Sequence, residues 1–259
     1  MTHVNAQQQL RDQFVQAHGY WNPLWEPVLQ ALPEQFAAYV AFSAVPYRSG
    51  KLSPKVRELI SIAVNVSMTL MNEPAVRVHV RNALHLGATR EEILEVFGIC
   101  SVLGAHSVNY PLGLLIKEME RNGDSIDLKF SSRAKEVQKS WIKKRGYWPS
   151  SFDSLLALDP EFVSAYSNFS DAPRIDGPLD KKTVELICVA IDGSATHLFD
   201  NGITTHGMAA ISNGATLEEI LETLELASVT GIQSMMVGIS ILDEEMAGAD
   251  RRRTEPATT

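Results

Sequence analysis

The sequence is poor in cysteine and has no excess of basic residues. Its two cysteines, Cys100 and Cys188, stand far apart and in no CxxC or CxxH context. This excludes a disulfide-stapled scaffold and favours reduced thiols in a protein core. Lys and Arg number 23 against 31 Asp and Glu, a net charge of −8. That balance does not supply the basic face that nucleic acids or anionic membranes require.

Long hydrophobic runs are also missing. The first twenty residues contain no apolar stretch of signal-peptide length, and no uninterrupted apolar run reaches the roughly 18 residues of a membrane span. Hydrophobic residues nevertheless make up 45% of the 259 residues, which is enough to build a globular core. We therefore expect a cytoplasmic protein that folds in water, with no membrane partner.

The chain contains an internal repeat at an offset of 127 residues. About 37 of the 101 positions from Gly19 to Met119 are identical at this offset, without a gap. The longest matching segments are GATREEILE, which begins at Gly87, and GATLEEILE, which begins at Gly214. A turn-forming Asn-Gly-Asp at 122–124 marks the junction. The repeat predicts two homologous domains, over residues 1–122 and 131–250.

Both halves carry helix signals and no strand pattern. Ser53 precedes a proline suited to the first helical position. Thr89 and Thr216 each have a glutamate three residues later, which forms a capping box, and Gly87 and Gly214 suit the left-handed end of a preceding helix. Apolar residues recur at spacings of three and four, with no alternation of period two. The predicted fold class is all-α.

A histidine recurs with acidic residues in both halves. His79 and His206 lie on apolar helix faces, and each has an acid 21 residues and another six residues upstream. A carboxylate can orient an imidazole and raise its basicity, which makes a proton-transfer pair. The alternative is a core histidine near acids that only complement a helix dipole. The candidate catalytic residues are His79, Glu58 and Glu73 in the first half and His206, Glu185 and Asp200 in the second.

The residues around these histidines resemble a known family. The pattern H-x3-A-x3-G-A-T-x-E-E-I-L-E begins at His79 and again at His206, with a glycine near the end of the following helix at Gly104 and Gly231. This pattern is similar to that of the carboxymuconolactone decarboxylase and AhpD-like family. The resemblance implies helical domains that pair about a twofold axis and assemble with threefold symmetry. A fused pair would replace one dimer, so we expect a homo-oligomer, with a trimer favoured.

The family resemblance covers two chemistries. Its peroxidase branch uses C-x-x-C-x-x-x-H, but the cysteine positions here hold Asn72 and Ala75 in the first half and Phe199 and Gly202 in the second. Thiol peroxidase activity is therefore unlikely, because that chemistry needs sulfur. The decarboxylase branch implies a reaction without metal or cofactor, in which a carboxylate leaves a small unsaturated acid or lactone and a protein acid protonates the carbon.

The chain departs from the decarboxylase branch in the next helix. Members of that branch have a pattern similar to H-x3-Y-x-G-x-P in this helix. Both halves of this chain have different residues at the corresponding positions. We add His106 as a candidate catalytic residue, and Tyr110 and Glu225 as candidate substrate-binding residues. One half could hold the working pocket, or a composite pocket could draw a histidine from one half and a carboxylate from the other.

A metal site receives little support from the sequence. His197, Asp200 and His206 fall within ten residues, but Leu70 occupies the position of His197 in the first half and such sets arise by chance. We expect no metal and no cofactor. The favoured function is a lyase of the decarboxylase type. The alternatives are a lactone hydrolase or isomerase on the same fold and a catalytically silent oligomeric binding or scaffold protein.

Overall fold

The computed structural model describes residues 3–124, 126–174 and 177–254, which form α-helices joined by short turns and contain no strand. The predicted all-α class is confirmed. The first half forms α1 (His3–His18), α2 (Glu26–Ala31), α3 (Pro33–Ser43), α4 (Val45–Ser49), α5 (Pro54–Val66), α6 (Glu73–His85), α7 (Arg90–Ser101) and α8 (His106–Arg121). The second forms α9 (Ser132–Arg145), α10 (Asp153–Leu158), α11 (Pro160–Asp171), α12 (Lys181–Asp192), α13 (Asp200–Ser212), α14 (Leu217–Ser228) and α15 (Gln233–Thr254). Five 3-10 turns connect them: η1 (Pro23–Trp25), η2 (Val102–Ala105), η3 (Ser150–Phe152), η4 (Ala172–Arg174) and η5 (Val229–Ile232).

The helix boundaries follow the capping signals. The Thr89 and Thr216 side chains accept hydrogen bonds from the third backbone N–H of α7 and α14, and both capping boxes are complete. Gly87 and Gly214 adopt φ values of +83° and +89°, a conformation that costs glycine little because it has no Cβ. The same turn is therefore built twice, which confirms the internal duplication.

Equivalent contacts in the two halves show an internal twofold relationship. The hydroxyls of Thr69 and Thr196, which occupy the same repeat position, lie 3.1 Å apart and therefore mark the axis. Lys55 and Glu92 pair at 2.7 Å, and their counterparts Lys182 and Glu219 pair at 2.8 Å.

The central core is shared by both repeats. Helices α5 and α12 pack on each other and on α7 and α14. Leu59 and Ile60 of α5 and Leu186 and Ile187 of α12 are completely buried in one cluster. Burial of such side chains contributes about 1.5–3 kcal/mol each. The two halves therefore depend on one another for this part of their stability.

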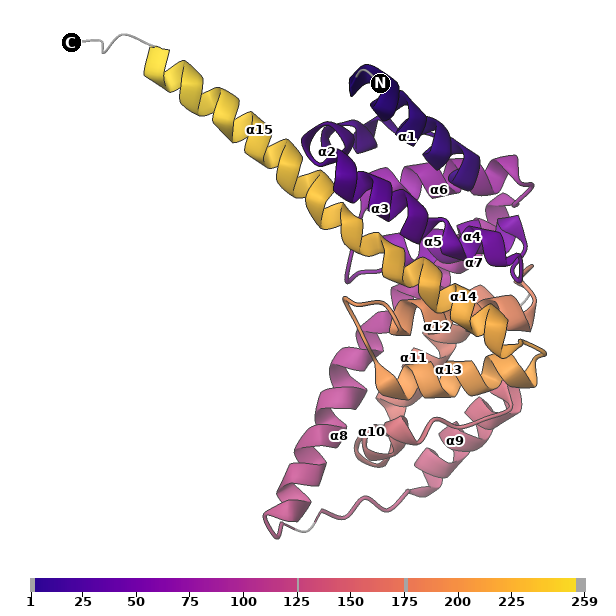
Figure 1. The fold of residues 1–259 in the computed structure, drawn as a ribbon. Coiled ribbons are helices and arrows are strands. Elements are labelled where there is room, and N and C mark those ends of the chain that lie inside the picture. Colours follow the sequence, from indigo (N-terminus) through magenta and orange to yellow (C-terminus); the bar gives the residue numbers. More distant parts are fainter. Residues whose placement is uncertain (1–2, 125, 175–176, 255–259) are drawn as a thin grey trace.

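The last helix of each repeat packs on the other repeat. α8 of the first half lies on α10 of the second, and α15 of the second crosses to α2 of the first before its end extends beyond the body (Figure 1). Ala105 is buried with Trp141 and Leu156, while Ile232 and Met236 pack against Phe14. The predicted domains are contiguous in sequence, but each core is completed by a helix from the other repeat.

Two continuous helical stretches, 90–121 and 217–249, have the length and composition of a membrane span. Neither stretch contains an uninterrupted apolar run of about 18 residues. In this fold they are the stretches that contain α7 with α8 and α14 with α15. α7 and α14 pack around the shared core, whereas α8 and α15 each pack on the other repeat. Length and composition alone are therefore weak support for a membrane location.

Candidate active site

The first repeat brings His79 of α6 to Glu58 of α5. His79 Nδ1 lies 2.8 Å from Oε2 of Glu58, and both side chains are mostly buried. Ser53 caps α5 and sets the start of the helix that carries Glu58. Because Nδ1–H donates a hydrogen bond to the carboxylate, Nε2 is the nitrogen left to exchange a proton with a ligand.

A small cavity borders His79. We call it the first-repeat cavity; its volume is about 70 Å³, space for about five water molecules. It is closed by α1 of the same repeat and by Gln233 and Met236 at the start of α15. Its polar lining consists of His18, Tyr20, Asn22, Tyr39, Tyr47, Ser61, Asn65, Asn72, His79, Thr230 and Gln233.

The lining of the first-repeat cavity contains no Asp, Glu, Lys or Arg, and His79 brings Glu58 behind it. Burial raises the pKa of Tyr20, Tyr39 and Tyr47, so their hydroxyls stay protonated and can donate hydrogen bonds. Burial, assisted by His79, lowers the pKa of His18 to about 4. The cavity therefore offers neutral donors and a single imidazole–carboxylate pair.

The second repeat forms the equivalent pair. His206 Nδ1 lies 2.6 Å from Oε2 of Glu185. Burial lowers the pKa of His206, but the neighbouring Cys188, Glu185 and Tyr147 outweigh this effect and leave the pKa well above its usual value. His206 Nε2 lies 4.0 Å from Asp192 Oδ2. This imidazole is therefore placed between two carboxylates.

A second, larger cavity of about 820 Å³ lies beside the second pair. Glu185 and Tyr147 line it together with Lys144, Arg145 and Lys181, whereas His206 is not among its lining residues. Lys144 and Arg145 are held by ion pairs with Asp171 at 2.9 and 2.7 Å. The larger cavity is therefore in contact with the carboxylate of the pair and not with its imidazole.

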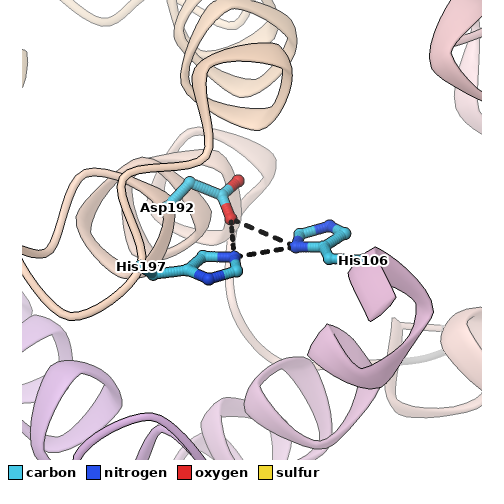
Figure 2. A group of neighbouring side chains, drawn as sticks. All are labelled: His106, Asp192 and His197. Carbon is cyan, nitrogen blue, oxygen red and sulfur yellow. Dashed lines mark hydrogen bonds and ion pairs between the residues drawn. The ribbon is translucent and has the colours of Figure 1, made fainter. Parts of the chain in front are cut away.

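His106 belongs to the first repeat but lies in the second-repeat site. Its Nδ1 is 2.9 Å from His197 Nε2 and 3.8 Å from Asp192 Oδ1. Figure 2 shows the three side chains pointing toward one another. His197 Nε2 is 3.6 Å from the same oxygen. This composite arrangement forms because α8 packs on the second repeat. One repeat supplies a histidine and the other supplies a carboxylate.

Burial governs the charges of this composite group. It raises the pKa of Asp192 to about 7, with His206 opposing and Glu185 adding to the shift. It lowers the pKa of His106 to about 4, and repulsion from His197 and His206 acts in the same direction. Burial also lowers the pKa of His197. Near neutral pH, both imidazoles are therefore neutral bases.

The other sequence candidates lie apart from these groups. Glu73 begins α6 and pairs with Arg77 on the surface, so it is not the acid that reaches His79. Asp200 begins α13 and accepts a hydrogen bond from the backbone N–H of Asn201. His197, Asp200 and His206, whose proximity in the chain gave a metal site little support, form no ligand cluster among the described residues. Tyr110 is 41% exposed and lies edge-on to Phe199, while Glu225 is half-buried on α14; neither lines the two cavities.

Sequence reasoning missed Asp192 and the lining tyrosines. Asp192 interrupts the apolar run LICVAID at an inward position where the first repeat has Asn65. A charged residue inside an apolar run, where the other repeat has a neutral residue at the same position, is a signal that could have identified Asp192. The tyrosines carry no such signal, because their meeting at one cavity depends on how α1, α3 and α4 fold over α5.

Comparisons with known proteins identify the family of the chain. A family model described as the carboxymuconolactone decarboxylase family matches residues 33–108 and 160–244, two segments that begin at the same repeat position. A crystal structure from Burkholderia xenovorans, named as a candidate gamma-carboxymuconolactone decarboxylase subunit, is 35% identical. It covers 94% of this chain and 98% of its own, with a TM-score of 0.87. No curated protein matches the sequence. The chain belongs to the carboxymuconolactone decarboxylase family.

Proposed function

We propose that this protein is a lyase that removes a carboxylate from a small unsaturated acid or lactone, and that His79 delivers the proton that completes the reaction. The observation that carries the proposal is the position of His79, which lines the first-repeat cavity while Glu58 holds its Nδ1. The family name and the name of the similar crystal structure favour the same reaction class.

The proposed step needs an electron sink in the substrate and an acid in the protein. The bond between the carboxylate and the ring carbon breaks, and carbon dioxide leaves. The bonding pair moves into the unsaturated lactone or acid, and His79 then gives its proton to the carbon. Positioned proton transfer of this kind contributes typically about 10²- to 10⁴-fold in rate.

The cavity lining supports the loss of charge. Phe14, Trp25 and Leu226 form an apolar wall, and the neutral tyrosine hydroxyls and amides can orient the substrate carboxylates. A carboxylate in such surroundings is less well solvated than in water, which favours its departure as an uncharged molecule. The volume of about 70 Å³ is below the roughly 150 Å³ of a cavity that holds benzene, so the lining side chains must move apart to admit a carboxylated lactone.

The two repeats differ in what surrounds their imidazoles. His79 lines a cavity, whereas His206 lies within the polar cluster that contains Asp192 and Glu185. A general acid must come within hydrogen-bond reach of the carbon that it protonates. We therefore assign proton delivery to the first repeat.

A matched pair of variants tests the assignment. Carbon dioxide release is measured from a panel of carboxylated lactones and keto acids with His79→Gln and with His206→Gln. We expect His79→Gln to lower turnover by at least about 10²-fold and His206→Gln by less than about tenfold. Unchanged turnover in His79→Gln, with its melting temperature also unchanged, would contradict the proposal and favour the silent scaffold.

We also propose that three chains assemble in the cytoplasm. Exposed apolar side chains occur along the exchanged helices, at Leu114 and Leu115 on α8 and at Val237, Ile241 and Leu242 on α15. Such residues often mark interfaces when they gather on one surface. Light scattering after gel filtration should give three times the 28.5 kDa chain mass. A single-chain mass would contradict the assembly.

A further inference from the structure

The second repeat contains a polar cluster that the proposed reaction does not use. We propose that His106, Asp192 and His197 bind one divalent first-row transition metal ion, of which Zn²⁺ is the representative probe. This group is called the His–His–Asp site below, and its three side chains converge in Figure 2.

The distances within the His–His–Asp site fit a metal. Its three ligand atoms are separated by 2.9, 3.6 and 3.8 Å. A triangle with these edges has a centre about 2.0 Å from each atom, which matches Zn–N and Zn–O bonds of about 2.0–2.2 Å. Two imidazoles and one carboxylate are also ligands that suit Zn²⁺ and Fe²⁺.

The surrounding residues hold these ligands in place. The backbone N–H of His197 donates to Ser194 O at 2.9 Å, and that of Phe199 donates to Asp192 O at 2.8 Å, so the loop after α12 is pinned. The Phe199 ring stacks on His106 with a centroid distance of 4.0 Å. Such supporting contacts fix ligand orientation in metal sites.

His206 lies beside the His–His–Asp site but is not one of its three ligands. Its Nε2 lies 4.0 Å from Asp192 Oδ2, whereas the His106 and His197 contacts are to Asp192 Oδ1. Its Nδ1 is held by Glu185. His206 therefore belongs to the neighbouring group.

The equivalent location beside His79 holds other residues at all three ligand positions. Asn65, Gln233 and Leu70 stand at the positions of Asp192, His106 and His197, and Gln233 Nε2 donates directly to Asn65 Oδ1 at 2.6 Å. A neutral amide pair of this kind needs no cation. The two repeats thus supply a natural control for the assignment.

A glycine makes room for Asp192. A Cβ at Gly202 would lie 2.1 Å from Asp192 Oδ2 and 2.6 Å from the Phe199 ring, so any other residue there must displace them. The first repeat has Ala75 at this position. Gly202 therefore belongs to the second-repeat arrangement and offers a variant that keeps all the ligands.

The test measures Zn²⁺ binding to the untagged, chelator-treated full chain. We expect one equivalent of Zn²⁺ to remain after gel filtration. The melting temperature should rise by at least about 5 °C when Zn²⁺ exceeds its Kd a hundredfold. Co²⁺ should give the visible absorption of a site with nitrogen and oxygen ligands. Less than a fifth of an equivalent of Zn²⁺, with no thermal shift, would overturn the proposal.

Variants locate the site. His106→Gln and Asp192→Asn introduce the first-repeat residues and should weaken Zn²⁺ binding by more than about 100-fold, and Gly202→Ala by about tenfold. His85→Gln removes an exposed imidazole and should bind like the wild type. Melting curves without metal identify any variant that fails to fold. For that case, Asp192→Glu, which keeps the charge, provides a second measurement and should also bind Zn²⁺ more weakly.

One further variant separates this site from its neighbour. Glu185, Cys188 and His206 also lie close enough to hold an ion. Cys188→Ser should leave Zn²⁺ affinity within about threefold of the wild type if the His–His–Asp site is correct. Loss of binding in Cys188→Ser, with wild-type affinity retained in His106→Gln, would place the ion on the neighbouring group and overturn the proposal.

Discussion

The two repeats share their helices and their imidazole–carboxylate pairs but differ in the residues around those pairs. In the first repeat, Asn65 and Gln233 form a neutral amide contact near His79. In the second, Asp192 and His106 place ionisable groups near His206. Both copies of the duplicated fold therefore keep the imidazole–carboxylate pair, while the surrounding side chains differ.

A second difference concerns the helix that covers each site. His18 of α1 lies 2.9 Å from Ser43, whereas its counterpart Arg145 of α9 lies 2.5 Å from Ser170 and also pairs with Asp171. A neutral imidazole in one repeat is thus replaced by a permanent cation in the other. This substitution adds one of the charged groups, both basic and acidic, that line the second cavity.

The largest expected effect is on turnover, and it distinguishes the two carboxylates, Glu58 and Glu185, that hold the imidazoles. Glu58→Gln should lower turnover by about 10²-fold, because an amide stabilises the His79 cation less well than a carboxylate. Glu185→Gln should lower turnover by less than about threefold. Steady-state kinetics across a pH range checks both, since a positioning role for Glu58 shifts the pH profile. Equal losses in the two variants would remove the functional distinction between the repeats.

The next effect concerns an ion pair found at only one of two equivalent places. Arg57 Nε lies 2.7 Å from Glu222 Oε1, with both groups buried, whereas Val184 occupies the Arg57 position in the second repeat. Arg57→Leu should cost about 3–5 kcal/mol of unfolding free energy, because it leaves a buried charge without its cation.

Denaturant unfolding of Arg57→Leu and of Val184→Ala makes the comparison. Val184→Ala should cost about 1–2 kcal/mol through lost packing alone. Similar losses in the two variants would show that the ion pair contributes no more than apolar packing does at the equivalent position.

A smaller effect depends on pH. Because burial lowers the pKa of His18 to about 4, the unfolded chain binds a proton there more tightly than the folded chain does. The stability that His18 contributes is therefore present above about pH 6.5 and is lost as pH falls toward 4, by on the order of 1–3 kcal/mol. His18→Gln should flatten the dependence of unfolding free energy on pH in this range.

The exposed His85→Gln is the control for this measurement, and it should leave the pH dependence close to that of the wild type. If both variants changed the dependence of unfolding free energy on pH equally, burial of His18 would not be the source of that dependence. An equivalent change at Arg145 is not expected to act in this window, because a guanidinium stays charged there.

The smallest effects are expected at the acids that begin α6 and α13. Glu73 pairs with Arg77 where both side chains are more than 70% exposed, and such pairs contribute little in water. Glu73→Gln and Asp200→Asn should each change stability by less than about 0.5 kcal/mol and turnover by less than about twofold. A tenfold loss of turnover in either variant would return that acid to the catalytic set.

Much of the fold could be predicted because its signals are local. The capping residues Thr89 and Thr216 and the glycines before them specify where helices end and restart, whatever they pack against. The spacing of 21 residues between Glu58 and His79 recurs in the second repeat, and this repetition indicated a paired function. Burial of both partners then follows from the apolar faces that carry them.

The composite site could not be predicted in the same way. Its parts, His106 and Asp192, are 86 residues apart and belong to different repeats, and no periodic pattern relates them. They meet because α8 packs on the second repeat, a choice made by the apolar surfaces of several helices together. Sequence reasoning consequently included Glu73 and Asp200 among the candidates beside Glu58 and Glu185, because they are near the histidines in the chain, but both lie at the surface.

The sequence by itself determined that the chain is helical, that it is duplicated, and that each copy carries an imidazole and a carboxylate at matching positions. Those features depend on residue identity and short spacing, which act through local hydrogen bonds and helix periodicity. Only the tertiary structure decided which acid reaches which histidine and which imidazole borders a cavity. These outcomes depend on packing between segments distant in the chain, where shape and burial select among arrangements that local rules allow equally.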